Sequence, residues 1–349
     1  MEKTADFTEG RILSRLLRFA LPVLAALFLQ AMYGAVDLMV VGQFGAPTDV
    51  SAVSTGSQIM QTVTSLITGL AMGITILVGQ KIGEKRPEQA GDVIGSGICL
   101  FGVLAAVLTV LMILGAGFLA GLMHAPDEAF SQTVDYIRIC SAGAVFIIAY
   151  NVLGSIFRGI GDSRMPLFTV AAACVFNIGG DLLLVAGFHM GAAGAALATV
   201  AAQAASVLLS LAVIRRRTLP FTIGKKNLRF ERRLVGRILA LGTPIALQDL
   251  LVSISFLVIL AIVNSMGVIA SAGVGVAEKL CAFIMLVASA YMQSMSAFVA
   301  QNMGAGKPER AKRALLYGIG TSLMAGVTLF YFSFFHGDAM AGIFARDPQ

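Results

Sequence analysis

Long apolar stretches separated by short polar segments dominate the chain, and they set its fold class. A helix that crosses a bilayer needs about 20 apolar residues, because it rises about 1.5 Å per residue through a hydrocarbon core of about 30 Å. The stretches lack the period-two alternation that the strands of a membrane β-barrel require. The pattern therefore predicts an all-α polytopic membrane protein with nine spans, at about 17–41, 51–80, 93–122, 132–156, 166–188, 192–214, 236–263, 269–299 and 313–343.

The composition agrees with this class of protein. Hydrophobic residues make up 57% of the chain and charged residues 13%, and the mean hydropathy is +0.86. Soluble globular proteins carry about a quarter charged residues and slightly less than half apolar ones. A soluble enzyme, a disordered regulator and a nucleic-acid-binding protein are therefore excluded, although the net charge is +6. The partner that we expect is the lipid bilayer, and we expect no nucleic acid.

The basic residues explain that charge, because they sort to one side of the membrane. When successive loops are laid on alternate sides, 22 of the 25 Lys and Arg residues fall on the side of the N-terminus. The 215–237 segment carries nine of them, and Arg158 and Arg164 are counted as loop residues on the same side. The positive-inside rule then places the N-terminus in the cytoplasm of a bacterial cell, with the spans in the inner membrane. The first apolar stretch is too long for a signal peptide, so no cleaved signal is expected.

An internal repeat organises the spans into two units. Residues 79–98 align without gaps on residues 300–319, and seven of the 20 positions are identical. An even number of spans separates the two copies, so they run parallel and are related by an axis along the membrane normal. We therefore expect a first lobe of six spans at 1–218 and a second lobe of three spans at 219–349. A complete second copy would need three further spans, and a natural nine-span protein is the alternative.

Four segments of the chain are distinctive: LPVLAALFLQAMYGAVDLMVVGQFG (21–45), GQKIGEKRPEQA (79–90), FRGIGDSRMP (157–166) and NIGGDLLLV (177–185). They resemble the multidrug and toxic compound extrusion (MATE) transporters, most closely the bacterial DinF-like branch. This resemblance implies two lobes of six helices around a central cavity, with the second lobe shortened here. It implies export of cationic, amphiphilic drugs in exchange for H⁺ or Na⁺ by alternating access. It also implies a cation site at Asp37, Tyr136, Asn177, Asp181 and Thr199.

The depth of these residues independently favours a cation site. Ionisable groups inside the hydrocarbon core are costly and mark functional sites by default. Asp37, Asp181 and Thr199 share one depth in the outer half of the first lobe, and Tyr136 lies close to that depth. Asn177 precedes Asp181 by one helical turn, so both face the same way. Carboxylate, amide and hydroxyl oxygens suit Na⁺ or a proton. The alternative is that these residues only form hydrogen bonds that fix helix packing.

Three further polar residues in the second lobe are candidates for a substrate cavity: Gln248, Asp249 and Glu278. Glu278 would attract a cationic substrate, or it would pair with further helices. Pro22 lies inside the first span, where a proline removes a backbone hydrogen bond and makes bending easier. We expect protonation of Asp37 and Asp181 to change the shape of this span.

The sequence carries no pattern typical of an enzyme. It contains no glycine-rich phosphate loop, no HExxH motif and no nucleophile elbow. We expect no cofactor, no metal beyond a possible Na⁺ at Asp37, Asn177 and Asp181, and a monomer driven by an ion gradient. Two other functions stay open at this point: a lipid-linked sugar flippase of the same superfamily, and an inactive or structural membrane fragment.

Overall fold

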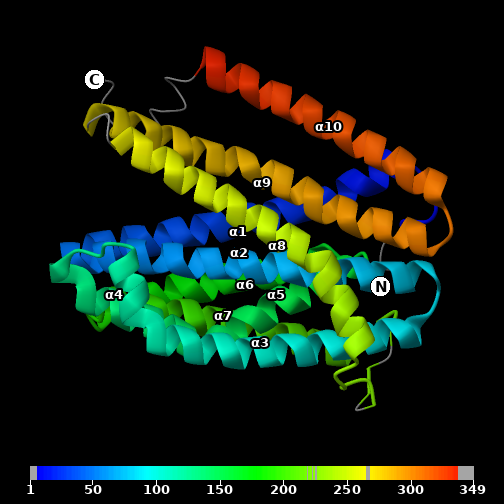
Figure 1. Ribbon diagram of the computed structural model, residues 1–349, viewed down its shortest axis with the longest axis horizontal. Helices are drawn as coiled ribbons and strands as arrows, with labels where there is room; N and C mark the ends of the chain where they lie inside the picture. Colours follow the sequence, from blue (N-terminus) through cyan, green and yellow to red (C-terminus); the bar gives the residue numbers. More distant parts are fainter. Residues whose placement is uncertain (1–5, 218, 222, 225, 265–267, 337–349) are drawn as a thin grey trace.

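A computed structural model describes residues 6–336 except 218, 222, 225 and 265–267, and leaves aside the side chains at 257, 260, 261, 264 and 268–280. The described part is built from helices, without strands, as the apolar pattern predicts (Figure 1). In chain order these are α1 (Ile12–Phe44), α2 (Pro47–Gly83), α3 (Pro87–Leu122), the 3₁₀ turn η1 (Asp127–Ala129), α4 (Phe130–Ala142), α5 (Ala144–Gly159), α6 (Arg164–Asp181), the π-helix η2 (Leu182–Gly187), α7 (Gly191–Arg216), α8 (Arg232–Asn264), α9 (Val268–Gly304) and α10 (Pro308–Phe335).

The number of membrane-crossing helices is close to the predicted nine. In the described ranges, eight helices are long and apolar enough to cross a membrane, and a bent pair brings the total to nine. The bent pair replaces the predicted span 132–156: α4 and α5 meet at Gly143 at an angle of 53°. The side chain of Val200 on α7 fills the space that a Cβ at Gly143 would occupy. The last helix begins at Pro308, earlier than predicted, because proline is favoured in the first turn.

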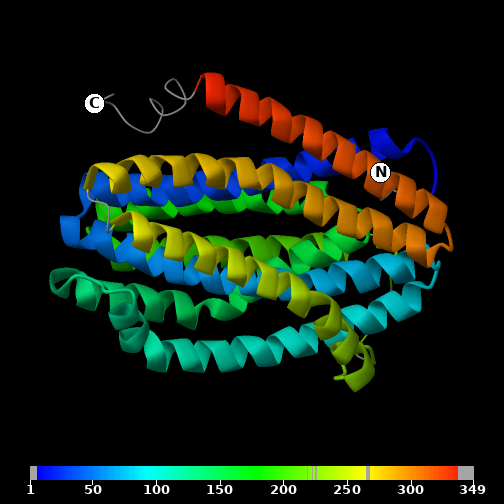
Figure 2. The same cartoon turned by 45° about the horizontal axis from the view of Figure 1, so that its top comes forward.

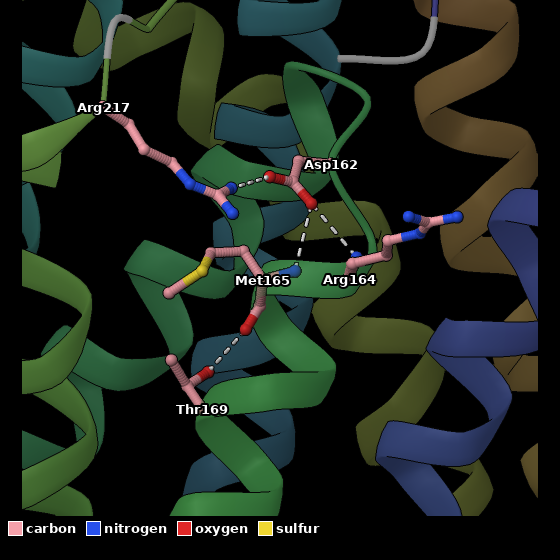
Figure 3. Close-up of polar contacts among 5 residues, drawn as sticks. All are labelled: Asp162, Arg164, Met165, Thr169 and Arg217. Carbon is pink, nitrogen blue, oxygen red and sulfur yellow. Dashed lines mark hydrogen bonds and ion pairs between the residues drawn. The ribbon is translucent and has the colours of Figure 1, made fainter. Parts of the chain in front are cut away.

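Polar side chains fix the helices that carry the candidate site. Asp162 precedes α6, and its Oδ1 accepts hydrogen bonds from the backbone amides of Arg164 (3.1 Å) and Met165 (3.0 Å). Its Oδ2 lies 3.3 Å from Nη1 of Arg217, directly after α7 (Figure 3). A carboxylate at a helix N-terminus satisfies free amides and interacts favourably with the helix dipole. Asp162 therefore ties the start of α6 to the end of α7.

At the other end of the bundle, Asp49 links α2 to α7. Its Oδ2 accepts the amide of Ala46 at the start of α2 (3.1 Å), and its Oδ1 accepts the amide of Ala192 at the start of α7 (3.0 Å). The neighbouring Gly191 has φ +53° and lies against this carboxylate, where a Cβ would clash. The start of α7, and with it the height of Thr199, is held in place from α2.

Helices α8–α10 form a second bundle on one side of α1–α7, the first bundle (Figures 1 and 2). Glycines let the bundles approach closely where α2 crosses α8 and α9. We call these contacts the seam. Five glycines of the seam lie against backbone atoms of the opposite bundle: Gly69, Gly73, Gly83, Gly242 and Gly304. The three seam glycines on α2 lie in the second half of that helix, toward the turn into α3. Small residues at such crossings are typical of membrane helices.

The seam contains the two copies of the repeat, and they pack on each other. Gly83 lies against the carbonyl of Gln301, and Gly304 lies against the carbonyl of Gln80. The aligned pairs of the repeat are Gln80 with Gln301 and Gly83 with Gly304. The Gly83–Gln301 contact and the Gly304–Gln80 contact are therefore equivalent, with the two copies exchanged. Reciprocal contacts of this kind are what a two-fold axis produces. The repeat therefore forms the junction between the bundles.

The segments that lead into α1 and α8 also cross to the opposite bundle. Phe7 is fully buried and stacks on Phe298 of α9, with ring centroids 4.8 Å apart. Its carbonyl accepts hydrogen bonds from Asn302 Nδ2 (3.2 Å) and Arg310 Nε (3.0 Å). The second lead-in segment mirrors it, because Asn227 Nδ2 donates to Asp92 Oδ1 of α3 (2.8 Å). Each bundle thus holds the lead-in segment of the other.

Candidate functional site

The candidate cation site lies inside the first bundle, beside α1. Asp37 lies about two turns before the end of α1 and is 5% exposed. Its neighbours Val40 and Val41 belong to a buried apolar cluster that surrounds this end of the helix. Transferring an ionised carboxylate into such surroundings is costly unless it is paired or hydrogen-bonded. Asp37 therefore needs polar partners, and α6 and α7 supply them.

Two side chains donate hydrogen bonds to Asp37. Asn177 of α6 is fully buried, and its Nδ2 lies 3.0 Å from Oδ1 of Asp37. Thr199 of α7 donates from its hydroxyl to Oδ2 of Asp37 over 3.1 Å. Asn177 Nδ2 also lies 3.4 Å from the Thr199 hydroxyl, which closes a triangle of polar contacts. Residues from three helices thus converge as the sequence predicts.

Asp181 completes the cluster but lacks donors. It is 0% exposed, and neither of its carboxyl oxygens accepts a hydrogen bond from any group in the described part of the chain. Its carboxyl group lies within hydrogen-bonding reach of that of Asp37, which is also an acceptor when ionised. The amide oxygen of Asn177 is buried without a donor as well. Three acceptor oxygens on one face of α6 are therefore buried without a donor from the described part of the chain.

The helix that carries Asp181 changes its geometry at this residue. α6 ends at Asp181, and the chain continues as the π-helix η2 until Gly187. A π-helical turn is wider than an α-helical one and occurs mostly at functional sites. The wide turn follows the acid directly, at the depth of the cluster.

Tyr136 lies near the cluster without bonding to it. It is 3% exposed, and its ring fills the space beside Gly56 of α2, where any side chain would collide with it. Its hydroxyl group interacts with the thiol of Cys140, one turn along α4. Asp37 acts on Tyr136 electrostatically. The structure thus brings four of the five predicted residues into contact and leaves the fifth beside them.

A second polar layer, which we did not predict, lies one turn beneath the cluster. Tyr33 precedes Asp37 by four residues, and Gln203 follows Thr199 by four. Gln203 Nε2 donates to the Tyr33 hydroxyl over 3.3 Å, and Gln30 also hydrogen-bonds Tyr33. The spacing of four residues, which places side chains on one helix face, was the available signal. The cluster therefore continues inward as a layer of neutral polar groups.

Among its described residues, the second bundle brings no comparable set together. Asp249 on α8 is half-buried, and Gln248 beside it is exposed. The Glu278 side chain lies outside the described residues. Within the described part, no group of three or more His, Cys, Asp and Glu side chains is arranged to hold a metal ion. The two carboxylates, one amide and one hydroxyl of the first bundle are the strongest candidate for binding a small cation.

Pro22 lies inside α1, in the part of the helix that packs on the second bundle. Leu16 and Phe19 before it and Val23 after it belong to one apolar cluster with Phe298 of α9. The part with Asp37 packs inside the first bundle. The proline thus lies in the same helix as Asp37 but in the half that contacts the second bundle.

The chain matches a protein-family model and is similar to several curated proteins. A family model described as MatE matches residues 22–183 and 244–349, which is more than half of the chain. A probable multidrug resistance protein, YoeA of Bacillus subtilis, is 27% identical over 338 residues, which cover 95% of this chain and 73% of the relative. An FAD transporter of Shewanella oneidensis is 27% identical over 349 residues, which cover 97% of this chain and 75% of the relative.

A solved structure shares the fold. The outward-facing conformation of a multidrug resistance MATE family transporter superposes with a TM-score of 0.90, covering 99% of this chain and 78% of that chain at 23% identity. At this identity the likeness describes the arrangement of helices alone.

Proposed function

Because the chain belongs to the MatE family, which is a transporter family and not an enzyme family, we propose that it exports small cationic, amphiphilic molecules in exchange for H⁺ or Na⁺. The protein is a multi-pass membrane protein, as its apolar helices require. The proposal places the coupling ion at Asp37, Asn177, Asp181 and Thr199. It also places the chain in the DinF-like branch, whose cation-site residues these resemble.

The observation that carries the proposal is that no group in the described part of the chain donates a hydrogen bond to either carboxyl oxygen of Asp181. Two buried carboxylates in contact, both ionised, would repel each other in surroundings that cannot solvate them. A shared proton turns one carboxyl group into a donor for the other. A Na⁺ ion would instead be held by the free oxygens of Asp181 and Asn177, with the oxygens of Asp37 and Thr199. Either ion neutralises the pair.

The structure of α1 supports alternating access as the mode of transport. One part of this helix contains Pro22 and packs on α9, and the other part holds Asp37. A change in the charge of the Asp37 and Asp181 pair changes how tightly this part of α1 is held by α6 and α7. We propose that α1 passes the change to the second bundle, so that the bundles, which act as the two lobes 1–218 and 219–349, rock about the seam.

The membrane orientation follows from the charges. The N-terminus, the turn from α2 to α3 and the turn from α9 to α10 gather at one end of the molecule (Figure 1). Together with the 215–237 segment, which joins α7 to α8 at the same end, these segments carry most of the lysine and arginine residues. We propose that this end faces the cytoplasm, in agreement with the positive-inside rule. The seam then closes the cytoplasmic side, and the carboxylate cluster lies in the outer half.

The substrate class rests on charge and on relatives. YoeA is named a probable multidrug resistance protein, and the candidate site carries acids. A cationic drug and a coupling cation compete for the same negative charge, which makes their exchange obligatory. The Shewanella relative is named an FAD transporter, so an anionic dinucleotide is the natural comparison substrate.

The test uses the whole natural chain in proteoliposomes with an imposed Na⁺ or pH gradient. Uptake of a cationic dye and of FAD is followed in wild type, Asp37→Asn, Asp181→Asn and the control Asp249→Asn. The proposal expects gradient-driven dye exchange that both site variants abolish and the control retains. Dye exchange that is intact in both site variants, or FAD as the exchanged substrate, would overturn it.

A further inference from the structure

An arginine inside the first bundle has no acidic partner. The sequence pattern placed Arg158 in a connector, as a topology signal. The structure places it in the last turn of α5, which continues to Gly159. The Nε of its guanidinium group is buried and has no hydrogen-bond partner. In the described part of the chain its charge forms no ion pair, whereas Arg217 pairs with Asp162 at the same end.

The side chain points away from the cytoplasmic end. Nη2 of Arg158 donates to the hydroxyl of Ser155, one turn earlier, over 2.9 Å. Nη1 lies 3.2 Å from the position that a Cβ would take at Gly154. Side chains of helices lean toward the N-terminus, and here the small Gly154 leaves room for the guanidinium group to do so. The charge is therefore directed into the bundle.

The direction matters because the second polar layer lies further along the same line. Tyr150, two turns before Arg158, interacts electrostatically with both Arg158 and Tyr33. Tyr33 belongs to the layer one turn beneath Asp37. Tyr33, Tyr150 and the guanidinium group therefore form a series of electrostatically linked polar groups that begins one turn from the carboxylate cluster, and we call this series the polar route.

The route ends at the seam. Gly159, the neighbour of Arg158, offers its carbonyl to Gln301 Nε2 of α9 over 2.9 Å. Gly79 of α2 is also closely packed at this contact, because a Cβ placed on Gly79 would lie 3.0 Å from the Cβ of Ala300 on α9. The guanidinium group thus stands where a cation that left the cluster inward would first meet the closed contact between the bundles.

We propose that Arg158 is an electrostatic barrier that keeps the coupling cation from leaking into the cytoplasm while the seam is closed. A fixed positive charge in a narrow polar passage repels cations and protons, as arginines do in selective pores. The barrier needs a charge that survives burial, and arginine stays protonated where lysine readily loses its proton. A neighbouring carboxylate would cancel the barrier, which accounts for the missing ion pair. The inference rests on the proposed coupling site.

A leak assay tests this role. Proteoliposomes carry wild type, Arg158→Gln, Ser155→Asp or the control Arg216→Gln, which removes an exposed arginine from the last turn of α7. An inside-negative potential is imposed without transported substrate, and entry of H⁺ and Na⁺ is recorded. Ser155→Asp leaves Arg158 in place but adds a carboxylate to its hydrogen-bond partner, so it tests the charge even if Arg158→Gln does not fold.

We expect the leak to rise on the order of tenfold in Arg158→Gln and in Ser155→Asp, and to stay at the wild-type level in Arg216→Gln. Adding Asp37→Asn to Arg158→Gln should lower the leak again, because the polar route begins one turn from the cluster. A leak at the wild-type level in folded Ser155→Asp would overturn the proposal. So would a leak in Arg158→Gln that persists when Asp37→Asn is added. If instead wild type exchanges nothing under a gradient, the proposed function fails and not the barrier alone.

Discussion

Helices α1 and α8 start the two bundles, and they are alike at one end and different at the other. Both have 33 residues, and each contains one proline, Pro22 or Pro244. In its first half each is buried against the opposite bundle: Phe19 of α1 packs near Phe298, and Ile238 of α8 packs near Ile74. In its second half, α1 carries Asp37, which accepts hydrogen bonds from two side chains.

The corresponding part of α8 carries apolar residues. Residue 259, which aligns with Asp37 at the offset of the two prolines, is an isoleucine with 49% exposure. Asp249 lies elsewhere on the helix and is half-buried. The two copies therefore share the junction between the bundles, whereas among the described residues the buried carboxylate cluster lies in the first copy. The repeat thus forms the contact between the bundles, and our proposal of ion coupling concerns only its first copy.

The largest expected effect comes from the acids of the first bundle. Asp37→Asn and Asp181→Asn each leave a neutral amide where the proposal needs a charge, so exchange should fall on the order of 100-fold, to background. The measurement is gradient-driven dye transport, normalised to the amount of inserted protein. Exchange at the wild-type rate in either variant would remove the distinction between the bundles.

A smaller effect is expected at the seam, and it should be equal in both copies. Gly83→Ala and Gly304→Ala each push a methyl group against a backbone carbonyl, which costs about 1–3 kcal/mol of stability. Melting temperatures in detergent measure the loss. The matched control is Gly102→Ala on α3, where nothing lies within 4 Å, and it should be neutral or stabilising by up to about 1 kcal/mol. A clear effect in only one of the two seam variants would contradict the reciprocal packing.

Thr199→Val should shift ion affinity without abolishing transport. The change removes the hydroxyl that donates to Asp37, and a hydrogen bond to a charged group contributes about 1.5–3 kcal/mol, or roughly ten- to a hundredfold in affinity. If Na⁺ is the coupling ion, half-maximal exchange should require more Na⁺, because a ligand is lost. If it is H⁺, half-maximal exchange should move to higher pH, because the ionised form loses a donor. An unchanged ion dependence would exclude Thr199 from the site.

The smallest effect is expected for Asp249→Asn on α8. This acid has no part in the carboxylate cluster, so exchange should stay within about twofold of wild type, as for most partly exposed substitutions. The same dye assay checks it. A loss as large as that of Asp37→Asn would show that the second copy also couples ions.

Hydropathy and charge were sufficient to predict the helices, because apolar length and helix propensity act locally along the chain. The cluster was also predictable from local features. Acidic residues in apolar stretches are rare, and their distance along the chain from the end of each span gives their depth in the membrane. The bend at Gly143 was not predictable, since it depends on the approach of Val200 from another helix. Arg158 was misplaced as a loop residue, because the sequence gives no sign that α5 extends past it or that Gly154 makes room for its side chain.

The contacts of the lead-in segments also lay beyond the sequence. Phe7 follows a short polar segment and has no periodic neighbours, so nothing local marks it as buried. Its partners, Phe298 and Arg310, lie almost 300 residues away in the chain. Contacts of this kind depend on how the two bundles meet, which the hydrophobic pattern of each helix does not determine.

Infrared difference spectroscopy of the purified protein tests most directly whether the contact between Asp37 and Asp181 holds the transported ion. Spectra are compared across a pH step, and before and after addition of Na⁺. The account predicts a carboxylic-acid or carboxylate band that responds to H⁺ or Na⁺ in wild type and in Asp249→Asn, and that disappears in both Asp37→Asn and Asp181→Asn. A response of unchanged size in those two variants would contradict it.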